Sequence, residues 1–126
     1  MKVSDLIAQI FADHQMKHIF SISGAGNVHI TGALDAWADS IPVLIVSGQE
    51  KSEFVHSHAK LRMWGVQGFD VAKTVSNITK YAVLVTDPKR VKYEFQKAIH
   101  IAESGRPGPV WIDIPTDVQA AQVDPD

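Results

Sequence analysis

The stretch that decides the fold class is Gly32-Ala33-Leu34-Asp35-Ala36-Trp37-Ala38-Asp39-Ser40-Ile41-Pro42-Val43-Leu44-Ile45-Val46-Ser47-Gly48-Gln49. Its first half has apolar residues at helical spacing, which predicts an amphipathic helix with Asp35 and Asp39 facing away from a sheet. Pro42 is expected to stop this helix, because proline has no N–H to donate. The unbroken aliphatic run 43–46 predicts a strand covered on both faces, as in parallel sheets. The residues expected on the buried helix face are Ile30, Ala33, Leu34, Trp37 and Ile41. The chain is therefore predicted to be an α/β protein.

Two segments mark the edge where a ligand would bind. In α/β sheets ligands sit beyond the carboxyl ends of the strands, which here places Ser47-Gly48-Gln49 at a binding edge. A short strand over 18–23 runs into Gly24-Ala25-Gly26-Asn27, a place where backbone amides can approach a cofactor closely. The third glycine and the distant acid of a dinucleotide fingerprint are missing, so a plain tight turn remains the alternative interpretation.

The remaining elements complete an alternating pattern. Ser4 is expected to cap a first helix that ends near residues 13–15 and has Val3 packed at its start. The inner face of this helix is expected to consist of Leu6, Ile7, Ile10 and Phe11. Strands are expected over 80–86 and 109–114, separated by a helix that begins at Asp87-Pro88 and ends at Gly105. Its expected buried stripe is Val91, Phe95, Ala98, Ile99 and Ala102. The prediction is a three-layer αβα sandwich with a mostly parallel sheet of about four strands.

Composition excludes several function classes. The 126 residues contain no cysteine, so disulfides, thiolate metal sites and cysteine nucleophiles are excluded, and a cytoplasmic location is expected. The net charge of −2 has both signs interspersed, which speaks against nucleic-acid or membrane partners. No apolar run reaches membrane-spanning length.

The side chains that could carry chemistry form no complete set. His56, His58 and Glu53 could offer a surface metal site only if another ligand converged on them, so no metal site is predicted. The elbow motif of serine hydrolases is absent around Ser47, and Asp35 with Asp39 is expected on a solvated face. No catalytic residue is nominated.

Three motifs resemble the pyrimidine-binding (PYR) domain of thiamine diphosphate enzymes of the acetolactate synthase type. The strand and Gly24-Ala25-Gly26-Asn27 turn resemble that domain's opening, and 39–49 is similar to its D-S-x-P-x-x-x-x-x-G-Q motif. Gly105-Arg106-Pro107-Gly108-Pro109-Val110 resembles its G-R-P-G-P-V ending. The resemblance implies a shortened thiamine diphosphate-binding fold over 1–115, followed by a linker-like tail over 116–126.

The departures from the family pattern shape the expected function. Asn27-Val28-His29 runs straight into the helix before D-S-x-P, which implies an internal deletion, and the family's H-E pair and G-P-G loop are absent. The H-E glutamate activates the cofactor, so the chain is expected to be inactive alone. By resemblance, the cofactor-binding residues are Gly24, Ala25, Gly26 and Gln49, and Gln67 lies near the substrate.

The same resemblance implies partners. Thiamine diphosphate is the implied cofactor, and magnesium is expected only with a separate diphosphate-binding domain, which another chain could supply. Loss of strands exposes sheet edges and apolar helix faces, which favours a homo-oligomer. The alternative function is a non-catalytic interaction or regulatory module that binds a partner through residues 50–69. Residues 61–70 are interpreted equally well as a lid or interface and as an irregular turn of helix.

Overall fold

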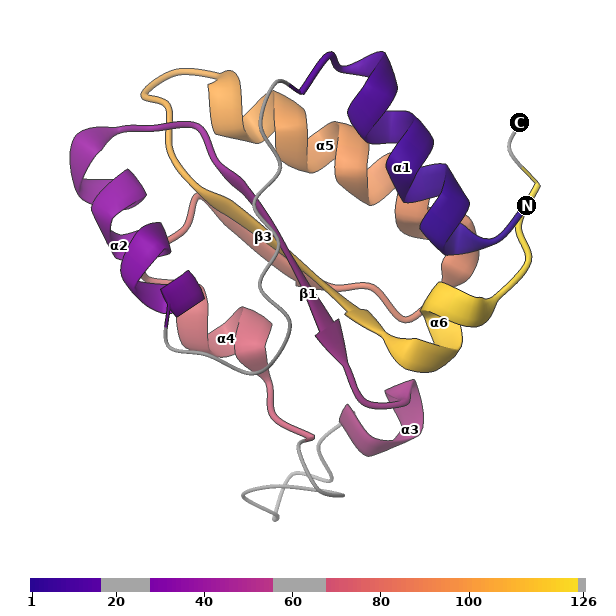
Figure 1. The fold of residues 1–126 in the computed structure, drawn as a ribbon. Helices are drawn as coiled ribbons and strands as arrows, with labels where there is room; N and C mark the ends of the chain where they lie inside the picture. Colours follow the sequence, from indigo (N-terminus) through magenta and orange to yellow (C-terminus); the bar gives the residue numbers. More distant parts are fainter. Residues whose placement is uncertain (17–27, 56–67, 125–126) are drawn as a thin grey trace.

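Three parallel strands form the centre of the protein (Figure 1). The computed structural model describes residues 1–16, 28–55 and 68–124. Strand β3 (Val110–Pro115) lies between β1 (Leu44–Gln49) and β2 (Tyr81–Leu84), and all of its side chains are buried. Helices cover both faces of the sheet, so the predicted αβα sandwich with a parallel sheet is confirmed. The strand predicted over 18–23 lies outside the described residues.

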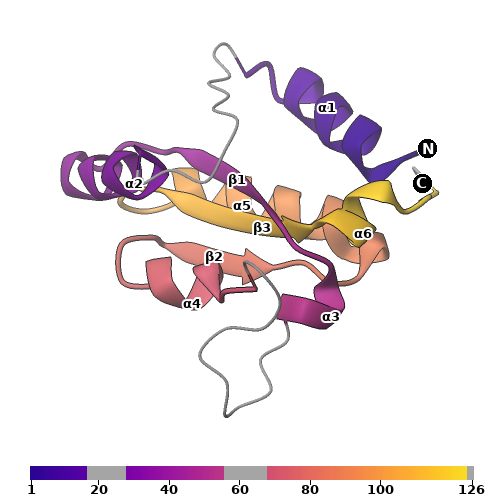
Figure 2. The same ribbon diagram turned by 60° about the horizontal axis from the view of Figure 1, so that its bottom comes forward.

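One face of the sheet is covered by α1 (Val3–Asp13) and α5 (Val91–Glu103), which lie side by side in Figures 1 and 2. Both helices present an apolar stripe to the strands, as their sequence periodicity predicts. The rings of Phe11 and Phe95 meet between them at a centroid distance of 6.0 Å. The buried residues shared by α1, α5, α6, the sheet and the segment after β2 are Val3, Leu6, Ile10, Val85, Val91, Phe95, Ala98, Ile99, Ala102, Val110, Ile112, Ile114 and Val118. The stripe predicted for α5 is confirmed at every position.

The chain enters and leaves α5 as its sequence indicates. The carboxylate of Asp87 accepts a 3.0 Å hydrogen bond from the backbone N–H of Lys89 and begins a 3₁₀ turn, η1 (Pro88–Arg90), that leads into α5. Beyond the helix, Gly105 adopts a φ of +58°, a left-handed conformation that glycine tolerates at little cost.

The opposite face is covered by α2 (Val28–Asp39) and α4 (Val71–Val75) (Figure 2). The core on this side is smaller and consists of Ala33, Ile45, Val75 and Trp111. The prediction for α2 is partly wrong. Ala33 and Ala36 are buried, whereas the larger apolar residues that were expected inside are 43–50% exposed: Ile30, Leu34, Trp37 and Ile41.

The geometry of α2 explains this difference. The helix meets the sheet through small alanine side chains, so the larger residues beside them on the helix face solvent. The helix also ends earlier than Pro42, because Ser40 adopts a φ of +59° and Ile41 N donates back to Ala36 O at 2.9 Å. Ile41 therefore lies outside the helix.

Both faces of β1 pack against a core, as the aliphatic run predicts: Leu44 and Val46 contact one core and Ile45 belongs to the other. Among the described strands, β1 has β3 as its neighbour on one side. It extends to Gln49, three residues beyond the aliphatic run, and most of its side chains are only partly buried. Its pairing with β3 places Ser47 opposite Asp113 and Gln49 opposite Pro115.

The carboxyl-terminal segment differs from the linker-like tail expected over 116–126. Residues Thr116–Ala120 form α6, and Val118 on this helix is 2% exposed within the core. The backbones of Met1 and Val123 exchange two hydrogen bonds of 3.1 and 2.9 Å, so the start of α1 and the segment after α6 lie together (Figure 1). Up to residue 124 the tail is part of the folded body.

In the three described ranges, no helix is both long enough and apolar enough to cross a membrane.

Candidate functional site

Gln49 occupies the carboxyl end of β1, at the edge where the sequence predicts ligand binding. Its side-chain amide Nε2 donates to Phe69 O at 2.8 Å and to Asp113 Oδ2 at 3.1 Å. Its Oε1 accepts a 3.0 Å hydrogen bond from the backbone N–H of Glu50. The residue is 8% exposed. Gln49 therefore links the segment before α4 to the carboxyl ends of β1 and β3.

A buried polar network continues from Gln49 into the sheet. The hydroxyl of Ser47 donates to Asp113 Oδ1 at 2.6 Å and accepts from Trp111 Nε1 at 2.7 Å. Ser47, Gln49, Trp111 and Asp113 lie at alternate positions of paired strands, so their side chains share the face that α2 and α4 cover. The carboxylate of Asp113, fully buried, accepts from both β1 side chains.

The pKa of the Asp113 carboxyl is shifted by its surroundings. Burial raises its pKa because the charged form loses solvation, while the hydrogen bonds from Ser47 and Gln49 lower it. The negative charge of Asp70 adds to the rise. The net pKa lies above the ordinary value of 3.8. Asp113 therefore binds a proton more readily than an exposed aspartate does.

Asp70 begins α4 at the same end of the sheet. Its carboxylate accepts a 2.8 Å hydrogen bond from Lys73 N, and its carbonyl accepts from the Thr74 hydroxyl at 2.9 Å. This is a conventional amino-terminal cap, which fixes the direction in which α4 leaves the Gln49 contact.

A second link at this edge joins α3 (Ser52–Val55) to α6. Asp117 accepts from Ser52 N at 2.9 Å and from Ser52 Oγ at 2.6 Å. Burial would raise the pKa of Asp117, but the hydrogen bonds from Ser52 and from nearby backbone amides together bring it below the ordinary value. This carboxylate stays charged and anchors the turn that follows β1.

The free hydrogen-bonding capacity of the Gln49 side chain is small. Both amide hydrogens of Gln49 are used within the protein, so its remaining capacity is one lone pair on Oε1. A ligand N–H or O–H could therefore donate to Gln49, whereas a ligand acceptor finds no free donor on it. Within 1–16, 28–55 and 68–124, no group of three His, Asp or Glu side chains is arranged to hold a metal ion.

The sequence-predicted site is only partly described. Gln49 lies where its motif places it, at a strand end. Gly24, Ala25, Gly26 and Gln67 lie outside the described residues, as do His56 and His58. Sequence reasoning missed Asp113 as the centre of the network. The available signal was a lone aspartate in an otherwise apolar strand, since a buried charge requires partners.

Comparison with known proteins identifies the relatives of this chain. No protein-family model matches it. It is 39% identical over 104 residues to a glyoxylate carboligase of Escherichia coli O157:H7, and 40% identical over 101 residues to an acetolactate synthase of Arthrospira platensis. The chain is homologous to the acetolactate synthases and glyoxylate carboligases. These matches cover 81% and 80% of the chain.

The acetolactate synthases are much longer than this homologue. The chain spans about 16% of the length of these two relatives, and 15% of the acetolactate synthase large subunit of Corynebacterium glutamicum, to which it is 37% identical. The fold also resembles the crystal structure of benzoylformate decarboxylase from Polynucleobacter necessarius. That likeness has a TM-score of 0.60 at 21% identity over 73% of this chain and 16% of the other. The resemblance to acetolactate synthase-type enzymes that the motifs indicate is confirmed.

Proposed function

We propose that this chain is a shortened PYR domain that contributes the pyrimidine side of a thiamine diphosphate site and does not catalyse by itself. The observation that carries the proposal is its homology to acetolactate synthases over about four fifths of its length. The proposed domain comprises residues 1–115 together with the segment 116–124 that packs on them. The structure supports the proposal because the carboxyl ends of β1 and β3 are paired as far as Gln49 and Pro115. The carboxyl ends of the strands are where α/β proteins bind ligands.

The acceptor that Gln49 offers fits one part of the cofactor. The free lone pair of Gln49 Oε1 can accept a hydrogen bond from the amino group of an aminopyrimidine. We further assign backbone contacts to Gly24, Ala25 and Gly26, and a position near the substrate to Gln67, on the strength of the family motifs. In this arrangement Gln49 orients the ring while its own amide is held by Asp113 and Phe69.

The proposed lack of independent activity follows from the missing acid. Thiamine diphosphate, when bound, supplies a nucleophilic carbon to the reaction. A carboxylate must hold a proton at the pyrimidine nitrogen for that chemistry, and the family's His-Glu pair does not occur in this sequence. Glu50 and Glu53 follow β1 but do not stand in that motif, so we assign neither to this role.

The proposal includes partners. We infer that magnesium and the diphosphate group require a separate diphosphate-binding domain, which another chain could supply, and that the chain works in the cytoplasm. A homo-oligomer is supported by the exposed apolar residues of α2 and by the two unpaired edges of the described sheet, on β1 and β2. In light scattering, Leu34→Asp should shift the protein toward the monomer, whereas Gln96→Asp on the exposed side of α5 should not. A wild-type monomer at high concentration would contradict the oligomer.

The test of cofactor binding is a calorimetric titration with thiamine diphosphate and magnesium. Saturable heat is expected for the wild type, with thiamine as the control that lacks the diphosphate. Gln49→Ala and Gly24→Ala should lose the heat, while Gln96→Ala, a change of an exposed glutamine, should keep it. Each variant's circular dichroism and urea transition show whether it is folded.

Absence of heat at millimolar cofactor, from wild-type protein that is folded, would contradict the proposal. The second candidate function would then take its place: a non-catalytic interaction module. The observation that favours it is the exposure of large apolar side chains, including Phe69 at the end of the 50–69 segment. Loss of a partner in a pull-down with Phe69→Ala, Met63→Ala or Trp64→Ala would support it.

A completed enzyme can be tested separately. If another polypeptide supplies the diphosphate-binding domain and the acid, pyruvate turnover should require both chains together and should be absent with either alone. Turnover by this chain alone would contradict its assignment as inactive by itself.

A further inference from the structure

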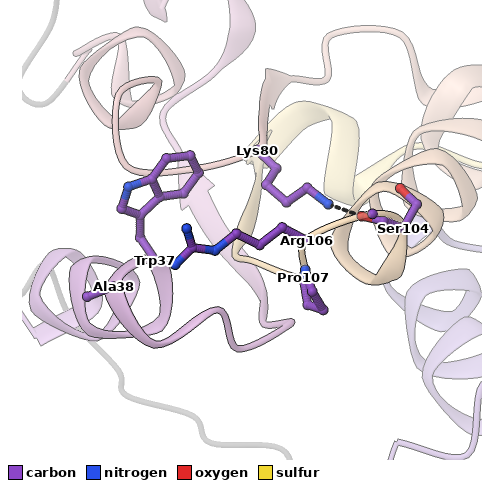
Figure 3. A pocket seen from close by; sticks show the side chains of 7 residues that line it. Trp37, Ala38, Lys80, Ser104, Arg106 and Pro107 are labelled. Atoms are coloured by element: carbon purple, nitrogen blue, oxygen red, sulfur yellow. Dashed lines mark hydrogen bonds between the residues drawn. The ribbon is translucent and has the colours of Figure 1, made fainter.

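A pocket of about 570 Å³ opens at the end of the sheet opposite to Gln49 (Figure 3). Its walls come from the end of α2, from the residue before β2 and from the loop between α5 and β3. The lining residues are Trp37, Ala38, Lys80, Ser104, Gly105, Arg106 and Pro107. All of them precede strands, so the pocket is remote from the proposed cofactor edge, and its volume is typical of small-molecule sites.

Two cations in this pocket are held in place by the fold. Lys80 Nζ donates to Ile101 O and, at 2.5 Å, to Ser104 O, so the ammonium group sits at the carboxyl end of α5. Arg106 Nε donates to Ser40 Oγ at 2.7 Å, which leads its guanidinium across to α2, as Figure 3 shows. No acidic side chain is among the seven lining residues.

The apolar wall is formed by Trp37 and the stem of Lys80. Gly108 lies beside this wall: a Cβ there would lie 3.1 Å from Lys80 Cδ, so that the lysine stem would have to shift slightly, and at an ordinary contact distance of 3.9 Å from Trp37 Cε3. The indole of Trp37 is 43% exposed and lies beside the guanidinium of Arg106 in Figure 3. A flat ring can stack on such an indole while its anionic group takes the two terminal guanidinium nitrogens of Arg106.

We propose that this pocket binds a small organic anion: a carboxylate or phosphate group carried on a flat apolar ring. The anion lies on Arg106, near the ammonium group of Lys80, and the ring lies against Trp37. The site is independent of the thiamine diphosphate proposal, because it shares no residue with the Gln49 edge.

The test uses matched probes on the wild-type protein, followed by calorimetry and by the indole N–H signals in NMR spectra. Phenylacetate and phenyl phosphate represent the two anion sources, phenylacetamide lacks the charge, and acetate and inorganic phosphate lack the ring. Both ring-bearing anions should bind at least about tenfold more tightly than the other three. The Trp37 indole signal, identified by its loss in Trp37→Phe, should shift, while that of the buried Trp111 should not.

Two substitutions place the binding in the pocket. Arg106→Gln and Trp37→Leu should each weaken phenyl phosphate binding by about tenfold or more, and Arg106→Lys should retain part of it. Lys89→Gln removes an exposed cation from the opposite end of β2 and should leave the affinity unchanged. Phenylacetamide binding as tightly as phenylacetate, or equal affinity of folded Arg106→Gln and wild type, would overturn the proposal. The same holds if wild-type oligomers that bury Trp37 exclude every probe.

The two proposals fail in different ways. Loss of cofactor heat in Gln49→Ala but not in Arg106→Gln assigns that heat to the carboxyl edge. Cofactor heat that depends on Arg106 and not on Gln49 would instead overturn the cofactor assignment, while leaving the anion pocket supported.

Discussion

Ser47 and Asp113 are register partners on adjacent parallel strands, and the serine hydroxyl donates to the fully buried carboxylate across 2.6 Å. Cross-strand neighbours in a sheet usually interact through apolar or surface groups. Here the pair is polar and buried, so the packing of β1 on β3 requires that Ser47 and Asp113 have all their hydrogen-bond partners.

Removing the acceptor should destabilise the fold. Asp113→Asn replaces a carboxylate oxygen with an NH₂ group that faces a donor on Ser47 or Gln49, which leaves a buried hydrogen bond unmade. The expected loss in the free energy of unfolding is about 1–3 kcal/mol, measured by urea denaturation. Asp35→Asn, at an exposed position of α2, should stay within about 0.5 kcal/mol of the wild type. Equal stability of the two variants would show that the network contributes nothing.

The raised pKa of Asp113 predicts a pH dependence of definite sign. Above the ordinary value of 3.8, the folded state holds the proton more strongly than the unfolded chain does. Stability should therefore fall as pH rises from about 4 to the raised pKa of Asp113, and then level off. The contribution of Asp117 has the opposite sign and lies below 3.8, because its pKa is lowered. The difference between wild-type and Asp113→Asn stability curves isolates the effect, and a difference that does not change between pH 4 and 7 would contradict it.

Tyr81 should ionise late. Its hydroxyl donates to Glu94 Oε2 at 2.6 Å and accepts from Lys97 Nζ at 3.1 Å. Burial and the Glu94 hydrogen bond raise its pKa above 10.0, more than Lys97 lowers it. In Tyr93→Phe, where Tyr81 is the remaining tyrosine of two, tyrosinate absorbance should appear above pH 10. Adding Glu94→Gln should bring the transition down toward 10, and an unchanged transition would show that Glu94 has no effect on the phenol.

Phe95 should dominate the core between α1, α5 and the sheet. The side chain is fully buried and meets Phe11, so Phe95→Ala opens a cavity and should cost about 3–5 kcal/mol of unfolding free energy. Tyr93→Ala, two residues away on the exposed side, removes ring contacts with Arg90 and Lys97 and should cost less than about 1 kcal/mol. Urea denaturation measures both, and similar losses would contradict this assignment of the core.

The sequence predicted correctly those elements in which the apolar spacing matches the side chains that are buried in the structure. The α5 stripe from Val91 to Ala102 and the central strand β3 follow from spacing, because each is covered as its pattern indicates. The α2 prediction was partly wrong because the two alanines make the contact, while apolar spacing alone ranks the larger residues as the buried ones. The extent of β1 was underestimated, since Ser47-Gly48-Gln49 resembles a turn until Asp113 supplies its partners.

The candidate site, too, could be predicted only in part from the sequence. Gln49 follows from the family motif, whereas its locked amide depends on residues far away in the chain, including Phe69. The anion pocket has no local signature, because Trp37, Lys80 and Arg106 come from three separate segments that only the fold brings together.

The hydrogen bonds between Met1 and Val123 bring the first residue and the segment after α6 close together in space. A short peptide joining the two ends would disturb little, so new ends could be opened elsewhere in the chain. The exposed turn near Gly105 and the region near Lys89 are two such places. A circularly permuted protein opened at either place would keep the β1–β3–β2 sheet, but its chain would contain β3 before β1 and β2. Such a protein would show whether the fold depends on the order in which the strands occur in the chain.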